Sequence, residues 1–211
     1  MASRSYPMRP RRDRNRLAER SSQPEDNDAE STNTAFWIRG LPHTTSYRGL
    51  FTALRGTGTI RNCRIVQDRP RSLTATAFVQ YFKQSDAFKL WELSRTLQFA
   101  VNGVYPQVEW HQEPIAEFPG RRVQTRGLLI RGPPSVVNYR VLEELWSGFL
   151  QWTKDFYIDS GEGEVLYFFT GWDDECRLAR RLLMTDLMGT VSVDYARDTC
   201  DCEREPEGPQ A

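Results

Sequence analysis

The sequence contains an internal repeat, and this repeat sets the size of the folding unit. Residues 36–42 (FWIRGLP) recur as residues 128–134 (LLIRGPP), 92 positions later. Residues 107–110 (QVEW) are echoed by residues 192–195 (SVDY), 85 positions later. Self-similarity at a nearly constant spacing indicates duplicated structural units. The chain of 211 residues therefore predicts two copies of one module of about 80 residues.

The first copy shows an alternation of strand and helix patterns. Short apolar or β-branched runs predict four strands, at residues 35–40, 63–66, 74–82 and 107–110. Apolar side chains at helical spacing predict two helices, which carry Leu50, Phe51 and Leu54, and Ala87, Leu90 and Trp91. Polar residues that can cap these helices precede them: Thr44, Thr45 or Ser46, and Ser85 or Asp86. The predicted order is β-α-β-β-α-β.

The second copy repeats this order. Its strands are expected near residues 127–131, 155–159, 164–170 and 190–195. Its helices are carried by two apolar sets: Val137, Val141, Leu142, Leu145, Trp146 and Phe149, and Cys176, Ala179, Leu182 and Leu183. The right-handed crossover rule places both helices of a copy on one face of a four-stranded antiparallel sheet. We expect an α+β protein made of two ferredoxin-like plaits, each with one sheet face free.

The segments outside the two copies are biased in charge and lack apolar periodicity. Residues 1–34 are Arg-rich and then acidic, with net charges of +5 over residues 1–20 and −4 over residues 21–34. Residues 198–211 carry five acids against one Arg, for −4. Such composition predicts disordered tails. The expected domains span residues 35–115 and 124–197, joined by a linker at 116–123 that leaves their mutual orientation open.

Composition excludes several classes of protein. No apolar run is long enough to span a bilayer, so no membrane association is expected. Four cysteines and two histidines lie at spacings that fit neither a zinc site nor a disulfide framework, so we expect no metal and a reducing compartment. The Arg-rich N-terminal residues favour the nucleus over the cytoplasm.

Catalytic signatures are missing from the sequence. It has no GxSxG, HExxH or Walker motif, and no Gly-rich dinucleotide turn after a strand. His43 lies beside a proline with no nucleophile paired to it in the sequence. We therefore expect a protein that is not an enzyme and needs no cofactor.

The free face of the first sheet is the expected binding site. Strand alternation points Trp37 and Phe78 outward on two central strands, which places the two rings side by side. Exposed adjacent rings suit nucleobase stacking, which is tolerant of base identity. The other side chains expected on or near this face are polar or basic: Arg39, Gln80, Thr76, Arg64 and Arg71.

At these positions the first copy, over about residues 35–115, resembles the RNA recognition motif (RRM) family. Residues 36–41 are similar to the family's first-strand hexamer at all six places. Residues 74–81 map onto its third-strand octamer, but only the second half agrees, and Thr76 replaces an aromatic residue. The resemblance implies a single-stranded RNA partner. Of the three rings on which the family stacks bases, two are present in this sequence, Trp37 and Phe78.

The second copy resembles the family less closely. Leu129 stands where the first-strand ring is expected, and the register of residues 164–169 is open, so the outward ring there is undetermined. RRM-like domains that lack the stacking rings often bind proteins, which makes a protein partner of the second domain a further expectation. The alternative for the whole chain is a protein-interaction scaffold with little specific RNA binding. The sequence leaves the oligomeric state open.

Overall fold

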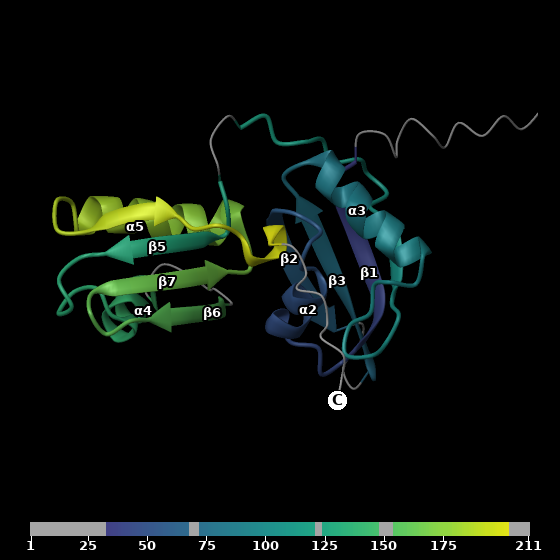
Figure 1. The fold of residues 1–211 in the computed structure, drawn as a ribbon, viewed down its shortest axis with the longest axis horizontal. Coiled ribbons are helices and arrows are strands. Elements are labelled where there is room, and N and C mark those ends of the chain that lie inside the picture. Colours follow the sequence, from purple (N-terminus) through teal and green to yellow (C-terminus); the bar gives the residue numbers. More distant parts are fainter. Residues whose placement is uncertain (1–32, 68–71, 121–123, 148–153, 203–211) are drawn as a thin grey trace, which may run out of the picture.

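The computed structural model describes residues 33–67, 72–120, 124–147 and 154–202 (Figure 1). It contains two units in succession along the chain, each with two principal helices and a four-stranded antiparallel sheet. The predicted fold class, a pair of ferredoxin-like plaits, is confirmed. Within the described residues no helix is both long and apolar enough to cross a membrane.

The first unit is built around a sheet with strand order β2-β3-β1-β4. Its elements are β1 (Ala35–Pro42), α2 (Tyr47–Ala53), β2 (Ile60–Gln67), β3 (Thr74–Tyr81), α3 (Gln84–Arg95) and β4 (Gln107–Trp110). Alternate strand residues, among them Phe36, Ile38, Ala77 and Val79, are fully buried in a core shared with Leu50 of α2 and Leu90 of α3. Both helices therefore cover one face of the sheet, and the expected order of elements is confirmed.

The helix caps were only partly predictable. Ser46 caps α2 as expected, because its hydroxyl accepts a hydrogen bond from the amide of Gly49 at 3.1 Å. The predicted caps of α3 are wrong: α3 begins after Lys83, which makes no side-chain capping bond. Asp86 instead accepts a hydrogen bond from the amide of Thr59. It packs so closely on Gly58 (φ +120°) that a Cβ there would lie 2.1 Å from its carboxyl carbon.

The second unit repeats the plan, with strand order β6-β7-β5-β8. Its elements are β5 (Gly127–Arg131), α4 (Tyr139–Ser147), β6 (Lys154–Asp159), β7 (Glu164–Phe169), the one-turn π-helix η1 (Trp172–Cys176), α5 (Arg177–Asp186), β8 (Ser192–Tyr195) and the 3-10 turn η2 (Thr199–Asp201). Tyr167 and Phe169 lie in the core, which fixes the register that the sequence left open. Phe149, expected on the first helix of this copy, lies outside the described residues.

The second unit covers the outer edge of β2 (Figure 1). The amide of Cys63 donates to the carbonyl of Thr170 at 3.0 Å, and Asn62 forms an antiparallel bridge with Gly171. The side chain of Asp173 accepts a hydrogen bond from Asn62 at 2.8 Å and pairs with Arg61 at 2.9 Å. An exposed strand edge is a template for unwanted pairing, and here part of that edge is already occupied.

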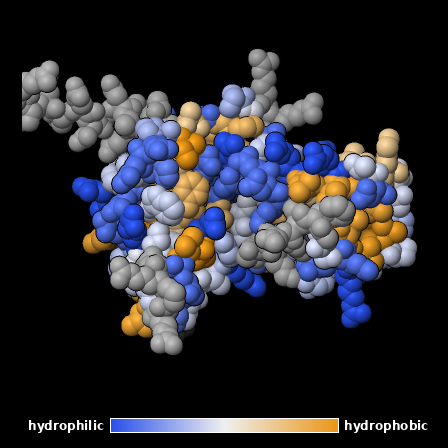
Figure 2. Space-filling view, turned by 180° about the vertical axis from the view of Figure 1, so that it is seen from behind, coloured by the Kyte–Doolittle hydropathy of each residue, from blue (hydrophilic) through white to orange (hydrophobic). Residues whose placement is uncertain are grey.

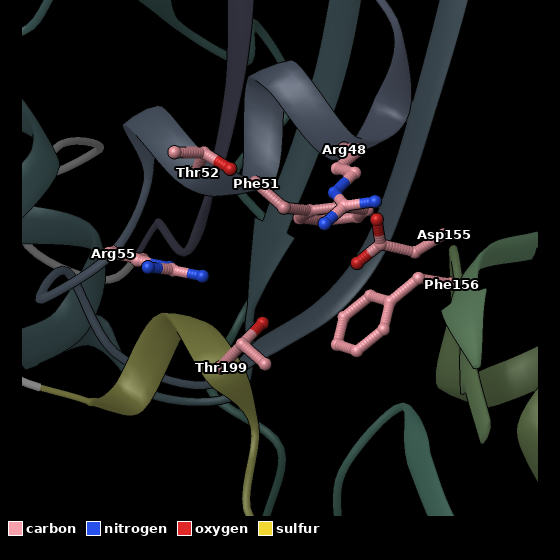
Figure 3. Close-up of a pocket in the computed structure, with 7 residues that line it drawn as sticks. All are labelled: Arg48, Phe51, Thr52, Arg55, Asp155, Phe156 and Thr199. Carbon is pink, nitrogen blue, oxygen red and sulfur yellow. The ribbon is translucent and has the colours of Figure 1, made fainter. Parts of the chain in front are cut away.

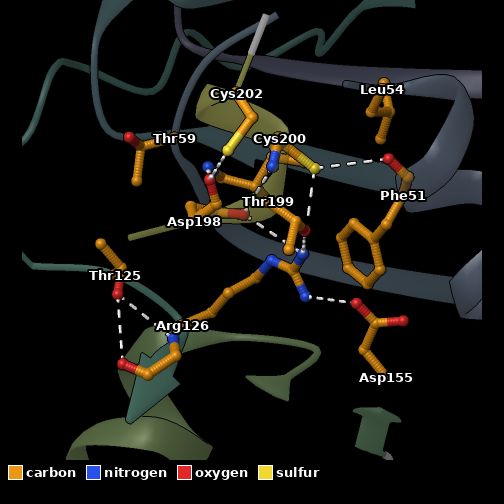
Figure 4. Close-up of polar contacts among 12 residues, drawn as sticks. Phe51, Leu54, Thr59, Thr125, Arg126, Asp155, Asp198, Thr199, Cys200 and Cys202 are labelled. Carbon is orange, nitrogen blue, oxygen red and sulfur yellow. Dashed lines mark hydrogen bonds and ion pairs between the residues drawn. The ribbon is translucent and has the colours of Figure 1, made fainter. Parts of the chain in front are cut away.

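A buried arginine joins the two units (Figure 4). The guanidinium of Arg126 lies 2.9 Å from the carboxylate of Asp155 and 3.2 Å from that of Asp198, and all three side chains are at most 1% exposed. Its central carbon lies 3.6 Å from the centre of the Phe51 ring, which belongs to α2 of the first unit. Burial alone would lower the pKa of Arg126, but Asp198, Cys200 and Asp155 raise it overall, so the side chain stays charged.

A small cavity of about 80 Å³ lies beside this ion pair, between α2 and β6 (Figure 3). It is lined by Arg48, Phe51, Thr52, Arg55, Asp155, Phe156 and Thr199. Burial raises the pKa of Asp155, while the positive charges of Arg126 and Arg48 oppose that rise. The cavity is large enough for little more than solvent molecules, so the two units are closely packed at this point.

The chain after β8 is structured, contrary to the sequence prediction. A disordered tail was expected from Asp198, and this expectation is wrong for residues 198–202. The carboxylate of Asp198 accepts a hydrogen bond from the amide of Ile60, and the carbonyl of Cys200 accepts bonds from Gly56 and Gly58. Loop amides of the first unit thus find their acceptors in this segment, which satisfies buried backbone donors.

The N-terminal boundary also differs. Asn33 and Thr34, predicted as the end of the first tail, are buried. The amide of Thr34 donates to the carbonyl of Ile115 at 2.9 Å, and the side chain of Asn33 donates to the carbonyl of His111 at 2.8 Å. These bonds hold the chain that follows β4 against the start of β1.

Replacing Arg126 by Ala is expected to destabilise the protein strongly, because Asp155 and Asp198 then remain buried without a countercharge. Loss of one partner from a buried ion pair typically costs about 3–5 kcal/mol. The free energy of unfolding in urea, followed by circular dichroism, measures the effect. Arg131→Ala is the matched control, since Arg131 pairs with Glu164 at the surface, where such a pair contributes about 0–1 kcal/mol. Equal losses in the two variants would contradict the central role of Arg126.

The thiols are expected to differ in reactivity. Burial raises the pKa of Cys63 to about 12 and also raises the pKa of Cys176 and Cys200, whereas Cys202 is half-buried. Because the thiolate is the reactive form, iodoacetamide at mildly alkaline pH should label only Cys202 in the folded protein and all four cysteines in urea. Mass spectrometry of the labelled peptides measures this. Rapid labelling of Cys200 in the folded protein would refute the docking of the C-terminal segment.

Candidate nucleic-acid interface

A row of four side chains crosses the open face of the first sheet. Trp37 of β1 pairs with Glu109 of β4 on one side and with Phe78 of β3 on the other, and Phe78 pairs with Arg64 of β2. Residues paired across adjacent strands project from the same face. The row therefore runs in the order Glu109, Trp37, Phe78, Arg64, from one edge of the sheet to the other.

The two rings at the centre of this row are available to a ligand. Trp37 and Phe78 are both half-buried, and their ring centroids lie 5.4 Å apart with an interplanar angle of 62°. Their strand neighbours Phe36 and Val79 are fully buried on the helix-covered face. Period-two alternation thus explains why these rings point away from the core, and their predicted adjacency is confirmed.

A third ring, which the sequence analysis missed, joins them. The imidazole of His111 stacks near Trp37 at 5.9 Å and meets Phe78 edge-on at 5.5 Å. Its Nδ1 atom lies 2.8 Å from the carbonyl oxygen of Glu113, and its amide donates to the carbonyl of Ala35. The ring is therefore held in place by the chain that follows β4. The available signal was its position directly after the QVEW strand.

The basic side chains expected near this face differ in their availability. Arg39 is exposed, but its Nε lies 2.8 Å from Glu109, which also accepts a hydrogen bond from Gln107 at 2.7 Å. Arg64 is exposed and has no ion pair within the described residues. Arg71 lies outside the described residues. Among the three arginines predicted for this face, Arg64 is therefore the one in the described residues whose charge is available to a ligand.

Thr76 and Gln80 offer little surface, contrary to expectation. Both lie on strand β3 with Phe78 between them, but they are only 7% and 5% exposed. Gln80 is next to Asn62 of β2, whose amide nitrogen lies 3.4 Å from the Gln80 side-chain oxygen. The alternation of β3 was predicted correctly, but the burial of these two side chains was not, because alternation fixes the face on which a side chain lies and not how far it is covered there.

The second sheet carries a corresponding row of different chemistry. Leu129 of β5 pairs with Asp194 of β8 and Leu166 of β7, and Leu166 pairs with Ile158 of β6, which is 57% exposed. Two leucines thus replace the central rings, and Ile158 replaces Arg64. From the reverse side of the molecule, Figure 2 shows further hydrophobic residues on the surface of the second domain and hydrophilic residues toward its boundary with the first.

The remaining outward ring of β7 is covered. Phe168 is 2% exposed and stacks on Phe156 with a centroid distance of 4.6 Å. It also lies against Gly127, where a Cβ would approach its ring to 2.6 Å. The centre of the second sheet therefore has no exposed pair of rings on which bases could stack. The described residues also contain no group of three or more side chains suited to hold a metal ion.

Comparison with known families finds a similarity within the first domain. Residues 37–95, from β1 to the end of α3, match the family model described as the RNA recognition motif. The resemblance stated for the first copy is thereby confirmed. No curated protein matches the chain.

Several solved structures are similar to this chain. A complex of two RRM domains shares 21% identity, with 39% of this chain and 96% of that chain covered and a TM-score of 0.34. An Sxl-lethal protein/RNA complex shares 19% identity, with 78% and 100% covered and a TM-score of 0.32. The first two RRM domains of yeast poly(U) binding protein share 18% identity, with 77% and 98% covered and a TM-score of 0.31.

Proposed function

We propose that the first domain binds single-stranded RNA by stacking bases on Trp37 and Phe78. The observation that carries this proposal is the pair of half-buried rings, 5.4 Å apart, at the centre of an open sheet in a segment that matches the RNA recognition motif. Stacking of one base on an aromatic side chain contributes about 1–3 kcal/mol. The two rings together offer enough binding energy to hold a short strand.

The groups around the rings fit a flat, charged ligand better than a purely apolar one. His111 adds a third aromatic surface beside Trp37 and Phe78. Arg64, next to Phe78 in the same row, presents a guanidinium that can bind a phosphate. An RNA strand supplies both the bases for the rings and the phosphates for this arginine.

The second sheet favours a different partner, which is the second candidate function. Leu129, Leu166 and Ile158 form an aliphatic row at the positions where the first sheet carries its rings and Arg64. Aliphatic side chains do not stack on bases but do pack against other proteins. A protein partner for the second domain thus accompanies, and does not replace, RNA binding by the first.

Trp37→Ala and Phe78→Ala in the full chain are expected to weaken RNA binding about five- to 150-fold each, the equivalent of about 1–3 kcal/mol. Fluorescence anisotropy with a short labelled single-stranded RNA of mixed sequence measures the affinity. Leu129→Ala is the matched control, because Leu129 occupies the place of Trp37 in the second sheet and should leave the affinity unchanged. Thermal unfolding confirms that each variant is folded. If both ring variants bind as tightly as the parent, base stacking on this sheet is wrong.

His111→Ala is expected to weaken RNA binding several-fold, whereas His111→Phe should restore the affinity of the parent, since a phenyl ring supplies the same stacking surface. The same anisotropy titration, at one fixed pH and salt concentration, compares the two variants. Equal weakening by Ala and Phe would show that His111 acts through its hydrogen bond to Glu113 and not through its ring.

A further inference from the structure

Two neighbouring hollows, which share Asp174, lie between the rings of the first sheet and helix α5 of the second domain. An open groove of about 580 Å³ lies along the edge of β2, lined on one side by Phe78 and Arg64 and on the other by Gly171 and Asp174. A second hollow of about 350 Å³ shares Asp174 and extends along α5, where Arg177 and Arg181 line it. A strand that leaves the sheet beside Phe78 therefore meets α5 next.

The two arginines at the far end of this path are free to bind an anion. Arg177 and Arg181 are four residues apart on α5 and so lie on the same helix face. Both are exposed, and neither has an ion pair among the residues that the structure describes. By contrast, Arg61 and Arg131 each lie within 2.9 Å of a carboxylate. Arg177 also lies 5.5 Å from the centre of the Trp172 ring, which helps to position it.

We infer that RNA bound on the first sheet continues through this groove onto α5, where Arg177 and Arg181 bind its phosphates. The inference rests on the proposed RNA binding by Trp37 and Phe78. It assigns the second domain an RNA contact made by a helix and the turn before it, not by its sheet. Guanidinium groups present paired donors that match phosphate oxygens, and two of them one turn apart can hold successive phosphates.

The carboxylates that line the groove determine where the bases and the phosphates of the bound RNA lie. Glu175 accepts hydrogen bonds from the amides of Thr170 and Gly171, each at 3.0 Å, and from the Thr170 hydroxyl at 2.8 Å. Asp174 is exposed and carries no ion pair within the described ranges. A phosphate beside Asp174 would be repelled, so a base occupies this place, with its exocyclic amino group toward the carboxylate. The phosphates then lie at Arg64 on one side and at Arg177 and Arg181 on the other.

The packing of the two domains fixes the width of this groove before RNA arrives. Bonds from Cys63 to Thr170 and from Asn62 to Asp173 join its two walls, and the buried Arg126 holds the domains together behind them. A preformed groove avoids the ordering cost that a flexible pair of domains would incur on binding. The strand therefore contacts both domains without a closing movement.

The test compares two lengths of single-stranded RNA on the full chain. An RNA of about three nucleotides covers only the sheet, whereas one of about twelve can also reach α5. The double variant Arg177→Ala/Arg181→Ala is expected to bind the short RNA like the parent and the long RNA at least five-fold more weakly. Two phosphates of the long RNA then have no arginine to bind them. The plot of its log affinity against log salt concentration should therefore become less steep, with a slope smaller in magnitude by about 1.4.

Arg140→Ala is the matched control, because Arg140 is an exposed arginine on α4, outside both hollows. It should change neither affinity nor slope. Unchanged binding of the long RNA by the double variant, or an equal loss with Arg140→Ala, would overturn the path. Trp37→Ala separates failure of the path from failure of the proposed function. If Trp37→Ala binds RNA like the parent, binding on the first sheet is wrong. If Trp37→Ala loses RNA and the double variant does not, only the extension onto α5 is wrong.

The proposed contact between a base and Asp174 can be tested separately, through the preference for particular bases. The parent should bind long oligo-C or oligo-A more tightly than oligo-U of equal length, because uracil lacks an exocyclic amino group. Asp174→Ala should reduce that difference while retaining binding to all three. An unchanged preference in the variant would contradict the contact between a base and Asp174.

Discussion

The buried charge of Arg126 is the interaction on which the arrangement of this molecule depends. A guanidinium removed from water is stable only where carboxylates and other acceptors surround it. Here Asp155 and Asp198 supply the countercharge, and the ring of Phe51 lies beside the cation. The carboxylates that neutralise the charge belong to the second domain, and the ring that covers the cation belongs to the first. The two repeats therefore pack against each other at this buried charge.

The open faces of the two sheets carry different side chains. The edge of β2 is partly covered by the turn before α5, while the face that carries Trp37 and Phe78 remains open. The equivalent face of the second domain keeps the same backbone pairing but carries Leu129 and Leu166. Duplication of a module thus preserved its hydrogen-bond register while the side chains on the open face diverged. One copy retains rings suited to bases, and the other offers aliphatic surface.

Local patterns in the sequence, together with the strand order of the repeated plan, were sufficient for the elements and for the central rings. Strand alternation predicts β1 and β3 from residues close in the chain, and the strand order then places Trp37 beside Phe78. Arg126, Asp198 and His111 escaped prediction because no such pattern marks them. Arg126 is one arginine among many in the sequence, and the acidic composition after β8 resembles that of a disordered tail. Their roles come from partners far away in sequence, which composition and periodicity do not reveal.

The docking of residues 198–202 has a consequence for the order in which the protein matures. Ile60 and Asp198 are 138 positions apart, and Phe51 and Cys200 are 149 apart, yet each pair shares a hydrogen bond. On the ribosome the first domain emerges well before residues 198–202 are made, so the amides of its α2–β2 loop face water until the second domain has followed. A segment beyond the second domain thus closes the first, and a product truncated before Asp198 leaves that loop without its acceptors.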